Sequence, residues 1–241
     1  MPRLSPFQIL FLLFVVFAFL WTRNPGMFGN PGRLSDMLYG LVAKLIILAV
    51  SITVHEFGHA SVAYALGDPT PKRLGRVSLN PIRHLDPLGT FMILFGPIGW
   101  GKPVVWTPWN IKRTSVRVAM IAVSLAGIVC NLILAFLVFN FLRFETFSIP
   151  RNAADILRNI VQLNIVLASF NILPIPPLDG YGFLLGVLPP SLSKYLAPLV
   201  RYGFLILIVL IMLPALGGPD LISALVNPVY RAFTRLVTGG L

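Results

Sequence analysis

Two histidines and a glutamate lie inside a long apolar run, where a lipid environment would normally exclude them. The run of residues 41–66 contains only Lys44 and Glu56 as charged residues. It also contains His55 and His59, which are two of the three histidines in the chain. An ionisable side chain at membrane depth costs about 2.5 to 3.5 kcal/mol and is a candidate for function. The run therefore predicts a helix that carries a polar site through an apolar environment.

His55, Glu56 and His59 have the spacing H-E-x-x-H. Residues four apart on a helix share one face and lie about 6 Å apart along the axis, so the two imidazoles can bind one cation. In this arrangement two histidines bind zinc, and the carboxylate acts as a general base on water. The same pattern also arises by chance in soluble helices. The apolar surroundings favour the metal site here.

The composition is that of a polytopic membrane protein. The 241 residues are 56% hydrophobic and 11% charged, and the mean hydropathy is +0.84. A net charge of +11 would suggest a nucleic-acid partner in a soluble protein, but the basic residues cluster in loops between apolar runs. We interpret this charge as membrane topology and expect no nucleic-acid partner.

Six apolar stretches are candidates for membrane-spanning helices. They lie at residues 7–21, 37–66, 118–142, 156–173, 202–216, which reaches span length from about residue 196, and 220–237. The last is interrupted by Pro228 and is either a short span or an interfacial helix. We expect an all-α polytopic membrane protein with about six transmembrane helices. Residues 1–241 would form one membrane-embedded domain, with a core at 37–190 and C-terminal helices at 191–241.

Residues 70–117 form the most basic connection between these stretches. They contain eight basic residues and a single acid, Asp86, which places them on the cytoplasmic side. Six spans then put both termini in the cytoplasm, with the protein in the cell (inner or plasma) membrane. Residues 74–79 could form a short strand, and residues 91–106 predict a small re-entrant β-hairpin region because glycines and prolines break them. We interpret His84 as a surface residue of this loop.

The fourth apolar stretch is broken by the sequence NILPIPPLDG at residues 171–180. Its three prolines remove backbone donors and unwind the helix, which leaves Asp179 as a carboxylate at membrane depth. Two ligands from H-E-x-x-H leave room for a third, and a carboxylate is a known choice. A proline-kinked loop with a capping aspartate is the alternative. In the third stretch, Ser124, Gly127, Asn131 and Ala135 form a small, polar face, on which Asn131 could bridge two helices.

Together these motifs resemble the site-2 protease family of intramembrane zinc metalloproteases. The resemblance covers residues 40–190 and rests on HEFGHA, SLAGIVCNLILA and NILPIPPLDG. The segments GRVSLNPIRHLDPLGT and FGPIGWGKPV are similar to the minimal bacterial and archaeal branch, which has about six spans. The resemblance implies a lipid-embedded enzyme that hydrolyses peptide bonds of transmembrane protein substrates.

The resemblance also implies a role for each matching residue. Glu56 would be the catalytic acid and base, and one zinc ion per chain would be bound by His55, His59 and Asp179. Asn131 would face the reacting carbonyl or the substrate backbone. The positions tied to substrate accommodation would be Asn171, Pro174 and Pro176.

Two other classes of function fit parts of the same sequence. A membrane transporter for an ion or metal could use the broken helix and the buried acids as an ion pathway, which flux into liposomes would reveal. A non-catalytic scaffold of the same fold could bind membrane partners. Such a scaffold would have no need of Glu56 beside two histidines, whereas a protease requires it.

Overall fold

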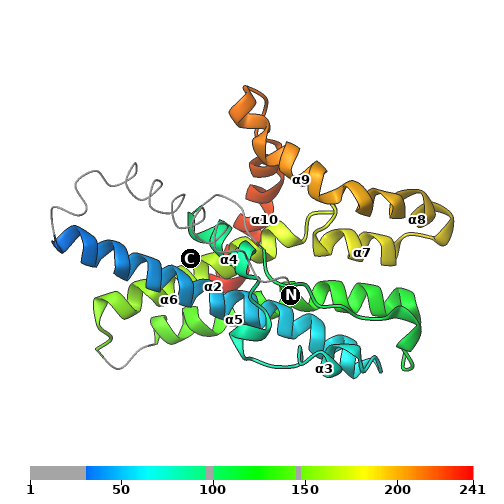
Figure 1. The fold of residues 1–241 in the computed structure, drawn as a ribbon, viewed down its shortest axis with the longest axis horizontal. Coiled ribbons are helices and arrows are strands. Elements are labelled where there is room, and N and C mark those ends of the chain that lie inside the picture. The colour runs from blue at the N-terminus through cyan, green and yellow to red at the C-terminus, as the bar shows by residue number, and fades with distance from the viewer. Residues whose placement is uncertain (1–30, 96–99, 145–147, 241) are drawn as a thin grey trace, which may run out of the picture. The chain divides into compact units, whose positions relative to one another are not determined.

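The computed structural model describes residues 31–95, 100–144 and 148–240 (Figure 1). This part of the chain consists of helices joined by turns and contains no β-strand. The chain divides into two compact units. One comprises Met1–Ile46 with Asp86–Trp100, and the other comprises Ile47–Leu85 with Gly101–Leu241. The mainly helical architecture confirms the predicted fold class at this level.

α2 (Pro31–Ala65) is a continuous helix of 35 residues that carries the HEFGH motif. It passes from the first unit into the second at Ile47. Residues 35–65 are long and apolar enough to cross a membrane, so the span predicted at residues 37–66 is a candidate span in the structure as well. The helix is followed by Gly67, whose φ of +109° favours a residue without a side chain.

Three further candidate spans lie in the second unit, at residues 116–143, 151–171 and 190–216. The first two are α5 (Val116–Arg143) and α6 (Arg151–Asn171). The third is a run of four short helices: α8 (Pro190–Leu196), η4 (Ala197–Tyr202), α9 (Gly203–Met212) and η5 (Leu213–Leu216). The described residues thus hold four candidate spans, where about six were predicted for the whole chain. The span expected at residues 7–21 lies outside the described residues.

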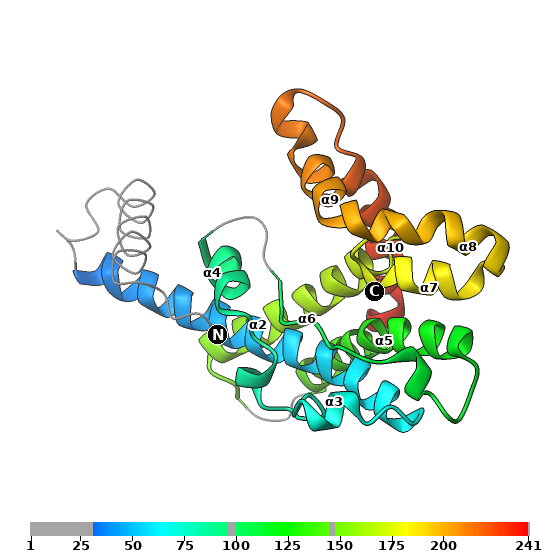
Figure 2. The same cartoon turned by 45° about the vertical axis from the view of Figure 1, so that its right-hand side comes forward.

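α10 (Leu221–Thr238) does not qualify as a fifth candidate span among the described helices. It lies beside α5 and α6 instead (Figure 2), and its side chains pack against theirs. Val237 is buried in this contact, and Tyr230 and Phe233 flank it. The structure therefore does not support a sixth span at residues 220–237.

The predicted break after the fourth apolar stretch is confirmed. α6 ends at Asn171, and α7 (Asp179–Val187) begins at the aspartate itself. The turns between the two helices bury Leu173 and Leu178 against Leu207 of α9. This apolar cluster fixes the start of α7 and therefore the position of its first residue.

Residues 74–79 do not form the predicted strand. They follow α3 (Thr70–Arg73), and the backbone N–H of Arg76 bonds back to the carbonyl of Pro71 over 2.8 Å. Gly75 lies between them with a φ of +69°. A glycine in the left-handed conformation turns the chain. The backbone of these residues is therefore not extended, although their alternating apolar pattern suggested a strand.

The predicted hairpin at residues 91–106 is also wrong for the described part of that segment. α4 (Pro87–Phe95) occupies its first residues, and an isolated bridge joins Leu85 to Gly101. The side chain of Asp86 accepts the N–H of Gly89 over 2.8 Å. An aspartate followed by proline is a helix start signal, because it caps the first turn and presets its backbone. This signal overrides the apolar, glycine-rich pattern.

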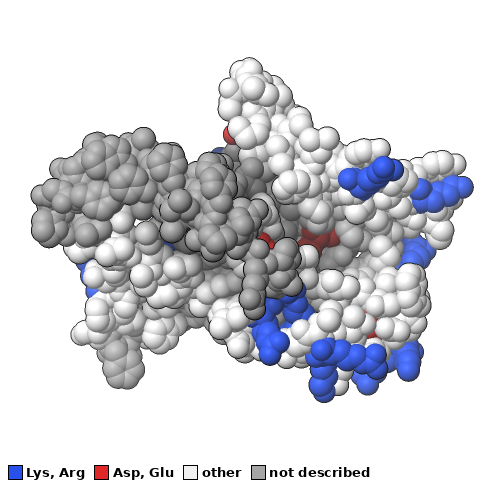
Figure 3. Space-filling model, viewed as in Figure 1, with Lys and Arg blue, Asp and Glu red and all other residues white. Residues whose placement is uncertain are grey.

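Two short helices complete the connection between α2 and α5. They are η2 (Pro81–Arg83) and η3 (Pro108–Asn110). Figure 3 shows basic side chains gathered around α3 and near α8, while most of the other visible described surface carries neither charge. The basic residues of segment 70–117 thus lie outside the candidate spans, apart from Arg117 in the first turn of α5.

Candidate metal centre

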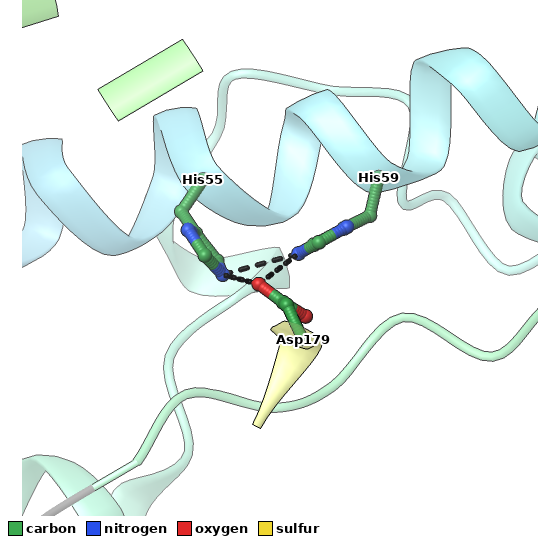
Figure 4. Close-up of side chains that lie close together, drawn as sticks. All are labelled: His55, His59 and Asp179. Atoms are coloured by element: carbon green, nitrogen blue, oxygen red, sulfur yellow. Dashed lines mark hydrogen bonds and ion pairs between the residues drawn. The ribbon is translucent and has the colours of Figure 1, made fainter. Parts of the chain in front are cut away.

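Three potential metal ligands from two separate helices converge on one point (Figure 4). His55 and His59 project from α2, and Asp179 projects from the first turn of α7. Oδ2 of Asp179 lies 3.2 Å from Nε2 of His55 and 3.3 Å from Nε2 of His59. The two Nε2 atoms are 3.1 Å apart. The predicted juxtaposition of Asp179 with the two histidines is therefore present.

The size of this triangle fits a tetrahedral metal ion. Ligand atoms about 2.0 to 2.1 Å from zinc, at tetrahedral angles, lie about 3.3 Å from one another. The three observed separations, from 3.1 to 3.3 Å, match that spacing. Oδ2 of Asp179 is buried and accepts no hydrogen bond within the described part of the chain. Three ligand atoms at this spacing can hold a cation and leave a fourth coordination position open.

The outer nitrogens of both histidines have acceptors as partners. Nδ1 of His55 lies 3.1 Å from Oδ1 of Asn131, and Nδ1 of His59 lies 2.6 Å from the carbonyl oxygen of Val123. An acceptor at Nδ1 requires the proton there, which leaves Nε2 of a neutral imidazole with its lone pair. Both lone pairs then face a carboxylate oxygen. In these tautomers three acceptor atoms face one point, an arrangement that a bound cation would stabilise.

Close packing of α2 on α5 brings these partners within reach. A Cβ on Gly127 would lie 2.6 Å from Cε1 of His55 and would also collide with Nε2 of His59. A Cβ on Gly58 would lie 2.8 Å from the carbonyl oxygen of Ala126. Small residues at the interface allow the helix backbones to approach. Glycine at 127 is therefore required for the imidazoles to occupy their positions.

Glu56 is buried beside the two histidines, and the segment of residues 101–107, which is neither helix nor strand, contacts it. Its Oε2 accepts the backbone N–H of Val104 over 3.0 Å. A Cβ added to Gly101 would lie 3.4 Å from Oε1 of Glu56. One oxygen of this carboxylate is thus held by a backbone donor, which makes Oε1 the candidate atom for proton exchange.

Asn131 is fully buried on α5 and contacts the site through His55. Its amide nitrogen, Nδ2, has no partner in the described part of the protein. A buried amide without an acceptor loses the free energy of a hydrogen bond, so an unpaired Nδ2 beside a metal site is a candidate donor to a ligand.

The other residues predicted for the site lie elsewhere around the break. The side-chain amide of Asn171 donates to the carbonyl of Leu167 on its own helix, over 2.9 Å. Pro174 is exposed, and Pro176 is buried against Gly203 of α9. Their contacts are those of a helix end and its packing, and their role toward a substrate stays a prediction.

Sequence reasoning missed two buried polar residues in the connection between α2 and α5. His84, interpreted as a surface residue, is fully buried, and its Nε2 lies 2.6 Å from the carbonyl oxygen of Ser78. Arg76 is 5% exposed. Both lie in a loop with no periodic pattern, so the sequence carries no signal for their burial. Burial lowers the pKa of His84 below its ordinary value, which keeps this imidazole neutral.

A second buried carboxylate holds the same connection to the end of α2. Asp68 accepts hydrogen bonds from Thr70, from the backbone N–H of Thr107 and from the amide of Asn110. Burial raises the pKa of Asp68, but these hydrogen bonds outweigh that effect and keep the pKa below its ordinary value. Because every contact comes from a donor of the chain, Asp68 is a structural anchor.

Comparison with known proteins adds relatives that share the name putative zinc metalloprotease. The chain is 42% identical to YwhC of Bacillus subtilis over 177 residues, which cover 70% of this chain and 80% of YwhC. It is 36% identical to Rip2 of Mycolicibacterium smegmatis and 34% identical to Rip2 of Mycobacterium tuberculosis, in each case over 70% of this chain and 66% of the relative. No family model and no solved structure matches it. The extent of the identity to YwhC shows that the chain belongs to the site-2 protease family of zinc metalloproteases.

Proposed function

We propose that the protein is an intramembrane zinc metalloprotease that hydrolyses peptide bonds within or near transmembrane segments of membrane-protein substrates. One observation carries the proposal: three converging metal ligands lie beside a buried glutamate, and His55, Glu56 and His59 belong to a candidate membrane span. The names of the relatives supply independent support for a zinc-dependent peptidase.

In this proposal one zinc ion per chain is held by His55, His59 and Asp179. When bound, zinc acts as a Lewis acid that polarises a carbonyl and lowers the pKa of water toward about 7. Val123 and Asn131 hold the two imidazoles in the tautomer that presents Nε2. Such outer partners orient the ligands and strengthen their basicity.

Glu56 is the general base. It takes a proton from the attacking water at Oε1, because Oε2 already accepts the N–H of Val104. As the scissile bond breaks, Glu56 returns this proton to the leaving amine nitrogen. A carboxylate anchored through one oxygen keeps the other in a constant position between the two transfers.

Asn131 stabilises the negative charge that develops on the scissile carbonyl oxygen. Its unpaired Nδ2 can donate to that oxygen, while its Oδ1 still accepts from His55. A preorganised donor at a developing oxyanion is typically worth about a hundred- to a thousand-fold in rate. Asn131 would therefore have two roles: its Oδ1 orients the ligand His55, and its Nδ2 stabilises the transition state.

The substrate in this proposal is a transmembrane segment of another protein, and both proteins are embedded in the lipid bilayer. Four apolar helices long enough to cross a membrane support this setting. The segment must unwind near the site, where Asn171, Pro174 and Pro176 would accommodate it. In this proposal the protein lies in the plasma or inner membrane, and the loop charges support an orientation with both termini in the cytoplasm.

The experiment compares the wild-type protein with Glu56→Gln, both reconstituted in liposomes with a membrane-spanning reporter substrate. Zinc content and cleavage are measured on the same samples. We expect both proteins to hold zinc, because Glu56 is not a ligand, and only the wild type to cleave. Equal cleavage by both proteins would overturn the assigned role of Glu56, and zinc uptake with no cleavage by either would favour the non-catalytic alternative.

A further inference from the structure

A single peptide group joins Arg76 to Glu56. The N–H of Val104 donates to Oε2 of Glu56 over 3.0 Å. The carbonyl at the other end of the same peptide, that of Pro103, accepts from Nη2 of Arg76 over 3.2 Å. One peptide group thus connects the guanidinium to the carboxylate. Its partly negative carbonyl oxygen faces the cation, and its partly positive N–H faces the anion.

Arg76 is buried without a carboxylate partner. It is 5% exposed, and the described residues show no ion pair to its side chain. Its Nη1 donates to the carbonyl of Arg83, so both contacts of the guanidinium are backbone oxygens. Burial lowers the pKa of Arg76, and the charge of Glu56 opposes this effect. A buried cation is costly, and the field of Glu56 offsets part of that cost.

The peptide held by Arg76 belongs to the segment that contacts Glu56. This segment, residues 101–107, is anchored on both sides of Val104: Lys102 donates its N–H to the carbonyl of His84 over 2.7 Å, and Thr107 donates to Asp68. A Cβ on Gly101 would lie 2.7 Å from the side chain of Ile52. Small displacements of the segment would therefore move the donor that orients Glu56.

We propose that Arg76 is a positioning residue for the general base, acting through the Pro103–Val104 peptide. Donation to the carbonyl polarises the peptide and strengthens its N–H as a donor, because hydrogen bonds in a chain reinforce one another. Arg76 thereby holds Oε2 in place and leaves Oε1 directed at the reacting atoms. This inference rests on the proposed function, since it assigns Arg76 a part in the proton transfers of Glu56.

A purely structural role for Arg76, as a clamp between two loops, would also explain its contacts. A double-mutant cycle separates the two roles. Arg76→Gln removes the guanidinium, and Val104→Pro removes the N–H while the carbonyl of Pro103 remains. Arg76→Lys keeps the charge but not the two directed contacts, and Arg73→Gln removes an exposed charge nearby as the matched control.

Turnover, KM and zinc content are measured for each variant in liposomes with the reporter substrate. We expect Arg76→Gln to lower kcat by about ten- to a hundred-fold, as outer partners of a metal site typically do, with KM and zinc content unchanged. Arg76→Lys should recover part of this loss, and Arg73→Gln should match the wild type. In the Val104→Pro background, Arg76→Gln should cause less than a two-fold further loss. Additive losses in the cycle, or a loss that follows zinc content, would overturn the proposal.

Hydrogen–deuterium exchange of residues 101–107 tests the contact without any activity measurement. Exchange at Val104 should be faster in Arg76→Gln than in the wild type and unchanged in Arg73→Gln. Unchanged exchange in Arg76→Gln would overturn the inference even if the protein is a protease. If the wild type fails to cleave while exchange responds as expected, the proposed function is what fails and the role of Arg76 in catalysis falls with it.

Discussion

The side-chain oxygen of Asn131 lies 3.1 Å from Nδ1 of His55, and this contact determines which nitrogen of His55 faces Asp179. The two residues come from α5 and α2, so the contact also ties the ligand to a second candidate span. His59 has an equivalent acceptor in the carbonyl of Val123. Both imidazoles are thus oriented from α5, and Asp179 approaches from a third helix.

Asn131→Ala should weaken zinc binding by about ten- to a hundred-fold, because His55 loses the acceptor that fixes its tautomer. Zinc affinity is measured in detergent by competition with a chelator. Asn140→Ala is the matched control, since the amide of Asn140 bonds only to the carbonyl of Phe136 on the exposed side of the same helix. Equal zinc affinity in the wild type and Asn131→Ala would show that the contact does not orient the ligand.

Gly127→Ala should displace both imidazoles and abolish stable zinc binding. The added methyl would lie 2.6 Å from Cε1 of His55, far inside van der Waals contact. Gly40→Ala is the control on α2, because a Cβ at Gly40 meets nothing within 4 Å and alanine favours helix. The measurement is zinc per folded chain after size-exclusion chromatography. Full zinc occupancy in Gly127→Ala would contradict this close packing of Gly127 against the two imidazoles.

The sequence was sufficient to predict those features of the fold and the site that depend only on neighbouring residues. The helical period places His55 and His59 on one face, and the prolines after Asn171 break α6 before Asp179. The extent to which Asp179 approaches the histidines could not be derived from spacing, because it depends on the packing of α7. The buried positions of Arg76 and His84 were missed for the same reason, since their contacts are with distant loop carbonyls.

The mistaken strand and hairpin show how turn chemistry outweighs apolar pattern. Residues 74–79 alternate in a way that suggests a strand, but Gly75 adopts a left-handed conformation. Residues 91–95 belong to α4, which begins at an Asp86–Pro87 start signal that the apolar pattern concealed. In both cases one capping or turning residue decides the local structure.

Asp68→Asn should lower the free energy of unfolding by about 1 to 3 kcal/mol at neutral pH, because the amide cannot accept all the N–H and O–H donors around it. The pKa of Asp68 is lowered in the folded protein, so its contribution is present above the unfolded pKa of about 4 and is lost as pH falls through the folded value. The difference between the variant and the wild type should therefore shrink in acid.

Thermal unfolding in detergent at pH 7 and at pH 3 measures this pH dependence. Asp155→Asn is the control, since Asp155 forms an exposed pair with Arg158 that is worth less than about 1 kcal/mol. A difference between Asp68→Asn and the wild type that is the same at both pH values would contradict the assigned ionisation of Asp68.

We propose above all that His55 and His59 on α2 and Asp179 on α7 together bind one zinc ion. Metal analysis by mass spectrometry of the purified wild type, Asp179→Ala and the control Asp220→Ala tests it most directly. Asp220 caps α10, away from the three ligands, by accepting from Ser223. We expect about one zinc per chain in the wild type and in Asp220→Ala, and almost none in folded Asp179→Ala. One zinc per chain in Asp179→Ala, bound as tightly as in the wild type, would contradict it.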